Sequence, residues 1–273
     1  MEILSSFLYQ MVFTVGLVVL FGFIISLCRH LFVKLTGRAG CRTLLFTGIV
    51  GTPVHELSHA LMCLIFGHRI EEIKLYDPTG EDGALGYVNH AYNKKNVYHQ
   101  IGNFFIGIAP IVCGSGILLI LMMLLVPEVH SSVVADINDS ASIFESVGSG
   151  AAYTGYLALT WKIAWDIFSF SYLLNIKWWI FIIIAIMISS HMELSRSDIV
   201  GGTKGFLYIA ALVFITNLVV GLISKKALAS MTWGISYISL YILGFLWLST
   251  IFCVVLVLVA LLLKGIKRIF GGK

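Results

Sequence analysis

Long apolar runs alternate with short polar stretches along the whole chain. Most of these runs are close to the length, about 20 residues, that an α-helix needs to cross the hydrocarbon of a bilayer. Six segments follow this pattern: 7–27, 44–66, 101–126, 177–190, 206–223 and 237–263. We therefore predict an all-α polytopic membrane protein with about six transmembrane helices.

The period of the pattern changes after the second segment. Residues 68–76 place β-branched and aromatic side chains among charged ones, 77–83 read D-P-T-G-E-D-G, and 84–92 resume an extended pattern. This order predicts a small β-hairpin directly after the second helix. Two interpretations are open: an ordinary surface hairpin, or a free strand edge with which an extended peptide pairs.

Two later stretches interrupt the apolar pattern. Residues 127–152 are rich in Ser, Asp and small side chains, which predicts an aqueous loop. Residues 151–175 are aromatic and apolar but contain Lys162 and Asp166, so an interfacial or partly buried helix is expected there instead of a clean crossing.

Composition agrees with a location in the lipid bilayer. The chain has 273 residues, of which 59% are hydrophobic and 12% charged, and its mean hydropathy is +0.95. The net charge of +4 is small, and the basic residues lie at segment ends, so no nucleic-acid partner is expected. We expect a single integral membrane domain over 1–273, with its core in 44–126 and 177–223. The basic tail after 263 predicts a cytoplasmic C-terminus, in the cell membrane of a prokaryote.

The cysteines give no framework of their own. None forms a C-x-x-C pair, so neither a disulfide scaffold nor a thiolate zinc site is expected. The five are scattered: Cys28, Cys41, Cys63, Cys113 and Cys253.

The sequence H-E-L-S-H at 55–59 carries the candidate chemistry. On a helix, His55 and His59 share one face at the spacing that binds a zinc ion, and Glu56 beside them is placed to activate water as a base. Two histidines and a glutamate in an apolar helix are costly unless they are paired or bound. This cost favours a metal site over a polar cluster that only holds helices together.

A catalytic zinc ion usually has three protein ligands. The stretch 189–198, S-S-H-M-E-L-S-R-S-D, offers His191 and Asp198 as equal candidates for the third, with Glu193 as a weaker one. The alternatives are a helix-end histidine at the membrane surface and an S-x-x-D capping box formed with Ser195. The remaining histidines lie in loops or at segment ends and are expected to be solvated: His30, His68, His90, His99 and His130.

One helical stripe in the third segment combines an amide with small residues. Asn103, Gly107, Pro110 and Gly114 fall on the same side of a helix, which we expect to face the metal-binding helix. Asn103 either binds a substrate carbonyl or only packs. The whole pattern predicts a zinc hydrolase whose chemistry is done within the membrane. The alternatives are a noncatalytic metal-binding scaffold or pseudoprotease, and a metal or proton transporter.

The order of these features resembles the site-2 protease family of intramembrane zinc metalloproteases. The resemblance is carried by H-E-L-S-H-A-L-M-C-L-I-F-G-H-R-I-E-E-I at 55–73, the hairpin after it, and G-I-A-P at 107–110. It implies that His55, His59 and Asp198 bind zinc, that Glu56 is the general base, and that membrane-spanning peptides are cleaved within or near the bilayer. The family's L-D-G is absent around Asp198, and the match lies mainly within 44–116.

Overall fold

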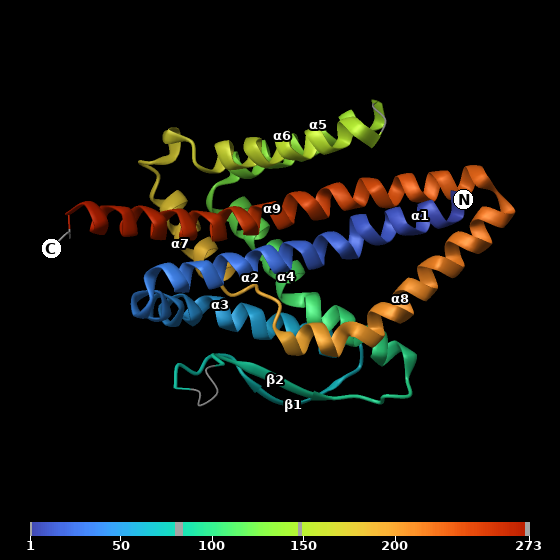
Figure 1. The fold of residues 1–273 in the computed structure, drawn as a ribbon, viewed down its shortest axis with the longest axis horizontal. Coiled ribbons are helices and arrows are strands. Elements are labelled where there is room, and N and C mark those ends of the chain that lie inside the picture. Colours follow the sequence, from blue (N-terminus) through green and yellow to red (C-terminus); the bar gives the residue numbers. More distant parts are fainter. Residues whose placement is uncertain (1, 80–83, 147–148, 271–273) are drawn as a thin grey trace.

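The computed structural model describes residues 2–79, 84–146 and 149–270. Over these residues the chain forms a helical bundle with one small hairpin on its side (Figure 1). The helices are α1 (Glu2–Met11), α2 (Leu17–Thr36), α3 (Arg38–Ile65), α4 (Val97–Leu125), α5 (Pro127–Ser146), α6 (Ser149–Ile167), α7 (Ile176–Ser189), α8 (Arg196–Ile223) and α9 (Lys225–Phe270). A π-helical turn, η1 (Val12–Gly16), joins α1 to α2, and a 3-10 turn, η2 (Phe170–Tyr172), precedes α7.

Four helices in the described parts of the chain are long and apolar enough to cross a membrane. They are Glu2–Thr36, which joins α1, η1 and α2, and then Val97–Leu125 (α4), Arg196–Ile223 (α8) and Lys225–Ile266 (most of α9). The predicted count of six is not confirmed. The helix α3 is 28 residues long, but its polar motif interrupts the apolar run. The helix α7 has 14 residues, or about 21 Å at 1.5 Å per residue, which is short of the hydrocarbon thickness of about 30 Å.

The helix α8 has the surface expected of a helix in contact with lipid. Large apolar side chains are exposed along most of its length, among them Leu207, Leu212, Ile215 and Leu222. Contiguous exposed apolar surface of this kind is unusual on a soluble protein. The four long apolar helices and this surface are therefore compatible with a membrane protein.

The predicted hairpin is confirmed. Strands β1 (Arg69–Lys74) and β2 (Tyr87–Ala91) pair antiparallel, with a register shift between Ile70 and Glu72. The predicted turn falls partly on residues 80–83, which lie outside the described residues. The hairpin lies on the opposite side of the bundle from α5 and α6 (Figure 1).

The aqueous loop predicted for 127–152 is wrong over its described residues, where α5 and the start of α6 are helical. Val129, Val133 and Ile137 are buried at every fourth position, which is the stripe that a helix presents to a core. Pro127 at the first position suits a helix start. Serine and aspartate between these positions hid the apolar stripe. The helix α6 is not among the candidate membrane spans.

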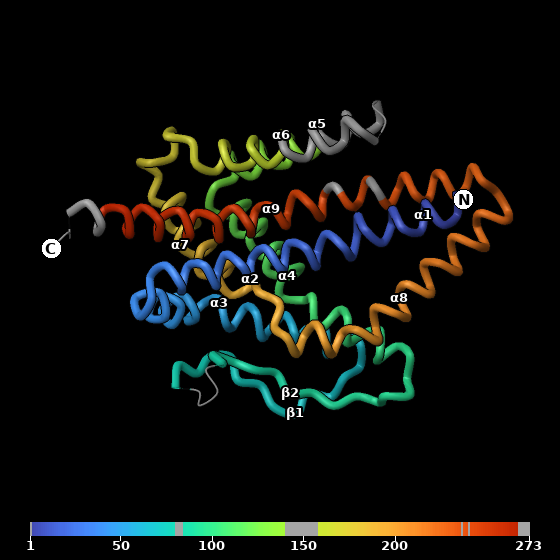
Figure 2. Tube along the Cα trace, viewed as in Figure 1, coloured from blue at the N-terminus to red at the C-terminus, as the bar shows by residue number. Residues whose placement is uncertain are grey.

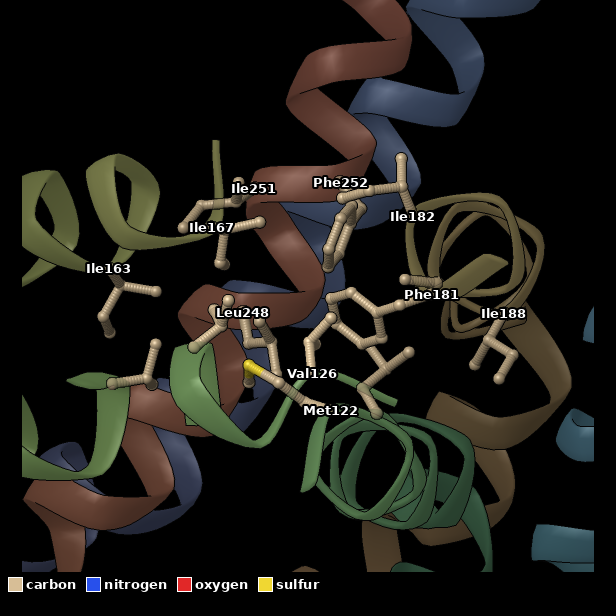
Figure 3. Packing of buried hydrophobic residues seen from close by; sticks show 14 of the residues in the cluster. Met122, Val126, Ile163, Ile167, Phe181, Ile182, Ile188, Leu248, Ile251 and Phe252 are labelled. Carbon is tan, nitrogen blue, oxygen red and sulfur yellow. The ribbon is translucent and has the colours of Figure 1, made fainter. Parts of the chain in front are cut away.

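The last helix of the chain packs along the first two. The long α9 runs back along α1 and α2, while α8 joins it at the end near the N-terminus (Figure 2). The largest apolar core lies where α4, α5, α6, α7 and α9 meet (Figure 3). In it, the rings of Phe181 and Phe252 pack edge to face with their centroids 5.7 Å apart.

Glycines let the helices that carry the candidate site approach closely. A Cβ at Gly107 of α4 would lie 2.7 Å from the carbonyl oxygen of Asp198, and one at Gly205 of α8 would lie 2.3 Å from that of Gln100. At Gly51 of α3 a Cβ would lie 2.2 Å from a backbone carbonyl of α7. Small residues at such positions allow the backbones of neighbouring helices to approach closely. They place the end of α7 beside the motif helix and the start of α8 beside α4, which itself packs against the motif helix.

Candidate metal centre

The two motif histidines lie one turn apart on α3, with their ring centroids separated by 4.7 Å. Nδ1 of His55 is 2.6 Å from the carbonyl oxygen of His191, and Nδ1 of His59 is 2.7 Å from that of Ile106. A carbonyl oxygen only accepts hydrogen bonds, so both Nδ1 atoms carry a proton and donate it. In the neutral imidazoles, both Nε2 atoms therefore present lone pairs.

These two Nε2 atoms lie 3.0 Å apart. Two lone pairs that face each other repel, and a bound cation between them removes the repulsion. Oδ1 of Asp198 lies 3.7 Å from Nε2 of His59, and the three candidate ligand atoms all lie within 4.8 Å of one another. In a tetrahedral zinc site with Zn–N bonds of about 2.0–2.1 Å, two nitrogens are separated by about 3.3 Å. The residues present therefore fit a zinc ion.

Asp198 forms the expected helix cap and also lies beside the two imidazoles. Its Oδ2 accepts hydrogen bonds from the N–H (2.9 Å) and the hydroxyl (2.5 Å) of Ser195, while Oγ of Ser195 accepts one from the N–H of Asp198 (3.1 Å). This is a complete capping box at the start of α8. Because the cap uses Oδ2, Oδ1 is left pointing toward His59. The cap orients the carboxylate and does not compete with the cluster.

The ring of His191 lies outside this cluster. Its Nε2 is 2.9 Å from Oγ1 of Thr47 and its Nδ1 is 3.5 Å from Oγ1 of Thr52, both on α3. The side chain is buried within the protein, with 6% of its surface exposed. Its backbone carbonyl instead orients His55. Partners of this kind fix the tautomer of a metal-binding histidine.

Glu193, the weaker candidate for a ligand, is also placed elsewhere. It forms an ion pair with Arg29 of α2. The pairing compensates two half-buried charges. Among His191, Glu193 and Asp198, the structure brings the Asp198 side chain to the two imidazoles.

The cluster lies in the wall of a cavity of about 620 Å³. Glu56 is 6% exposed and lines this cavity next to the imidazoles. The hairpin packs against Glu56: a Cβ at Gly86, just before β2, would lie 2.9 Å from Cγ of Glu56. Residues 84–90, which include most of β2, line the same cavity. The base candidate and a strand therefore line the same cavity.

Asn103 also lines the cavity, from α4. It is 7% exposed, and within the described ranges its Nδ2 has no hydrogen-bond partner. An unpaired buried donor is costly, so such groups are commonly paired by a ligand or water. The rest of its stripe turns toward other neighbours: Gly107 meets Asp198, and Gly114 meets Met192.

One expectation about the other histidines is wrong. His68 is buried rather than solvated, with 4% of its surface exposed, and its ring stacks on Tyr92. Sequence reasoning also missed the carbonyls of His191 and Ile106, since backbone groups leave no mark in a sequence.

The comparisons with known proteins bear on the motif region. A family model described as "Putative zincin peptidase" matches residues 48–164, an interval that contains His55, Glu56, His59 and the hairpin but not Asp198. Neither the curated proteins nor the solved structures contain a match to the chain. The chain is thus similar to this family over less than half of its length, and the geometry of the donor set is compatible with the peptidase description.

Proposed function

We propose that this protein is a zinc-dependent intramembrane endopeptidase of the site-2 protease type, which hydrolyses a peptide bond of a membrane-spanning or membrane-associated protein. One observation carries the proposal. The Nε2 atoms of His55 and His59 and Oδ1 of Asp198 converge in the wall of a cavity that Glu56 also lines.

His55, His59 and Asp198 would hold the metal. When bound, zinc supplies Lewis acidity, which polarises the scissile carbonyl and lowers the pKa of water to about 7. The protein keeps this donor set in place through backbone groups. The carbonyls of His191 and Ile106 hold both imidazoles in the tautomer with a free Nε2, and the capping box holds the carboxylate.

Glu56 is the general base in this proposal. Its carboxylate accepts a proton from the attacking water and then delivers it to the leaving amine. Asn103 donates from its unpartnered Nδ2 to a substrate carbonyl oxygen, where negative charge develops during attack. Both side chains line the same cavity as the imidazoles, so one bound peptide can reach all of them.

Strand β2 is the proposed substrate-binding edge. It lines the cavity, and on the side away from β1 it pairs with no other strand in the described part of the chain. An extended peptide can add to such an edge through main-chain hydrogen bonds. A helical substrate must first unwind, because its amides are shielded by their own hydrogen bonds. The strand edge stabilises the unwound form.

The helices around the cluster support cleavage within or near the bilayer. His59 and Ile106 connect α3 to α4, and Gly107 packs against the first turn of α8. Both α4 and α8 are candidate membrane spans. The donor set is therefore held between helices that suit a lipid environment.

The test is Glu56→Gln, assayed in proteoliposomes on a labelled model transmembrane peptide that the wild type cleaves. We expect cleavage to fall by about 10²–10⁴-fold, as for loss of a general base, with the zinc content unchanged. His55→Ala should lose zinc as well as activity, while His30→Ala, at an exposed position on α2, should lose neither. Parental activity in Glu56→Gln would contradict the assigned base. If none of these variants changes cleavage, the activity does not come from this site, which favours a noncatalytic scaffold.

A further inference from the structure

A second group of metal-binding side chains lies next to the proposed centre. Ligand atoms of Cys63, His68 and His90 all lie within 4.8 Å of one another. They come from three places in the chain: α3, the turn that follows it, and strand β2. Cys63 is completely buried, His68 is nearly so, and His90 is half-buried.

The hydrogen bonds of His68 define which of its nitrogens is free. Nε2 lies 3.0 Å from the carbonyl oxygen of His99, so it carries the proton and donates it. Nδ1 therefore presents a lone pair, and it lies 3.0 Å from Nδ1 of His90. Stacking on Tyr92 holds the ring in this position. The same device, a carbonyl that fixes the tautomer, orients His55 and His59.

A hydrogen bond between His68 and His90 is the simplest alternative to a metal. It accounts for two rings, but it gives no role to the buried sulfur of Cys63 in the same group. One thiolate and two neutral imidazoles are a donor set that suits zinc and similar borderline ions.

His99 does not complete this donor set. Its Nδ1 accepts a hydrogen bond from the N–H of Asn93 at 3.1 Å, so in the neutral ring Nε2 carries the proton. The group consequently offers three protein donors and leaves a fourth position for water.

We propose that Cys63, His68 and His90 form a second metal site, separate from the His55, His59 and Asp198 cluster, which binds a divalent ion such as zinc. The ion would tie β2 to α3. Because His90 also lines the cavity, binding there would fix the strand that faces Glu56. This inference does not depend on whether the protein hydrolyses peptides.

The two sites can be told apart by cobalt substitution of the full-length protein in detergent micelles. A thiolate bound to Co²⁺ gives a charge-transfer band in the near ultraviolet, and the first cluster contains no sulfur. We expect the wild type to bind two equivalents of Zn²⁺ and to show the band with Co²⁺. Cys63→Ser should lose the band and one equivalent, whereas His55→Ala should lose one equivalent and keep the band.

Two further cysteines provide matched controls. Cys41→Ser removes an exposed thiol and Cys113→Ser a half-buried one, and neither should change the band. If Cys63→Ser fails to fold, His90→Ala tests the site instead, because it removes a ligand that is only half-buried. It should also lose one equivalent. The proposal would be overturned if the wild type binds one equivalent and shows no band. It would also be overturned if the band persists in Cys63→Ser or disappears in Cys41→Ser.

Discussion

Oδ1 of Asp198 lies 3.7 Å from Nε2 of His59, although the two side chains come from helices that are far apart in the sequence. The relationship depends on the cap at the start of α8, in which Ser195 binds the other carboxylate oxygen. The helix cap and the candidate metal centre are therefore parts of one structure.

Asp198→Asn keeps an oxygen that can accept the Ser195 N–H but removes the negative charge. Loss of a residue that only hydrogen-bonds to a metal ligand lowers metal affinity by roughly 10–100-fold, and we expect a larger fall in zinc affinity for Asp198→Asn. The thermal stability of the metal-free protein should change little. Ser195→Ala should instead cost about 1 kcal/mol of stability and lower zinc affinity by about 10–100-fold. Chelator competition and thermal melts measure the two effects. Equal zinc affinity in Asp198→Asn and the wild type would exclude Asp198 as a ligand.

His191→Ala tests the alternative third ligand. The backbone carbonyl that orients His55 remains, so we expect the zinc content to stay unchanged. Stability should fall by about 1–3 kcal/mol, because the buried contact with Thr47 is lost. Elemental analysis of this variant beside Asp198→Ala makes the comparison. Loss of zinc from His191→Ala but not from Asp198→Ala would reverse the assignment.

Asn103→Leu separates catalysis from folding. The buried Nδ2 has no partner in the described structure, so its removal should leave stability unchanged or raise it slightly. We expect kcat/KM to fall by about 10²–10³-fold, as for loss of a donor to a developing negative charge, with zinc retained. Peptide cleavage and thermal melts provide the two readouts. A parental kcat/KM would leave Asn103 as a packing residue.

Gly107→Ala perturbs the metal centre without touching a ligand. The added Cβ would lie 2.7 Å from the carbonyl oxygen of Asp198, and overpacking of this kind typically costs about 1–3 kcal/mol. We expect the start of α8 to shift and zinc affinity to fall. Gly116→Ala on the same helix is the control, because nothing lies within 4 Å of its Cβ. If both variants bind zinc equally, the close approach of α4 and α8 does not position the carboxylate.

Much of the fold was predictable from local patterns. Long apolar runs predicted the helices, and the turn residues after 76 predicted the hairpin. The failures have a physical cause in each case. In α5, Ser131, Ser132 and Asp136 stand among the buried Val129, Val133 and Ile137, so composition indicated a loop where the helical period indicates a buried stripe.

The motif pair was predictable because His55 and His59 belong to one helix. The third donor was not, since His191 and Asp198 share one polar cluster and differ in long-range packing. Thr47 on α3 receives the ring of His191, and Gly107 on α4 admits the backbone at Asp198. Neither contact has a local signal in the sequence.

The most direct measurement is an anomalous difference map at the zinc edge from crystals of the zinc-loaded protein. The account predicts a peak about 2.0–2.2 Å from Nε2 of His55, Nε2 of His59 and Oδ1 of Asp198. A map with no peak between these atoms, or with a peak held by the ring of His191 in place of Asp198, would contradict it.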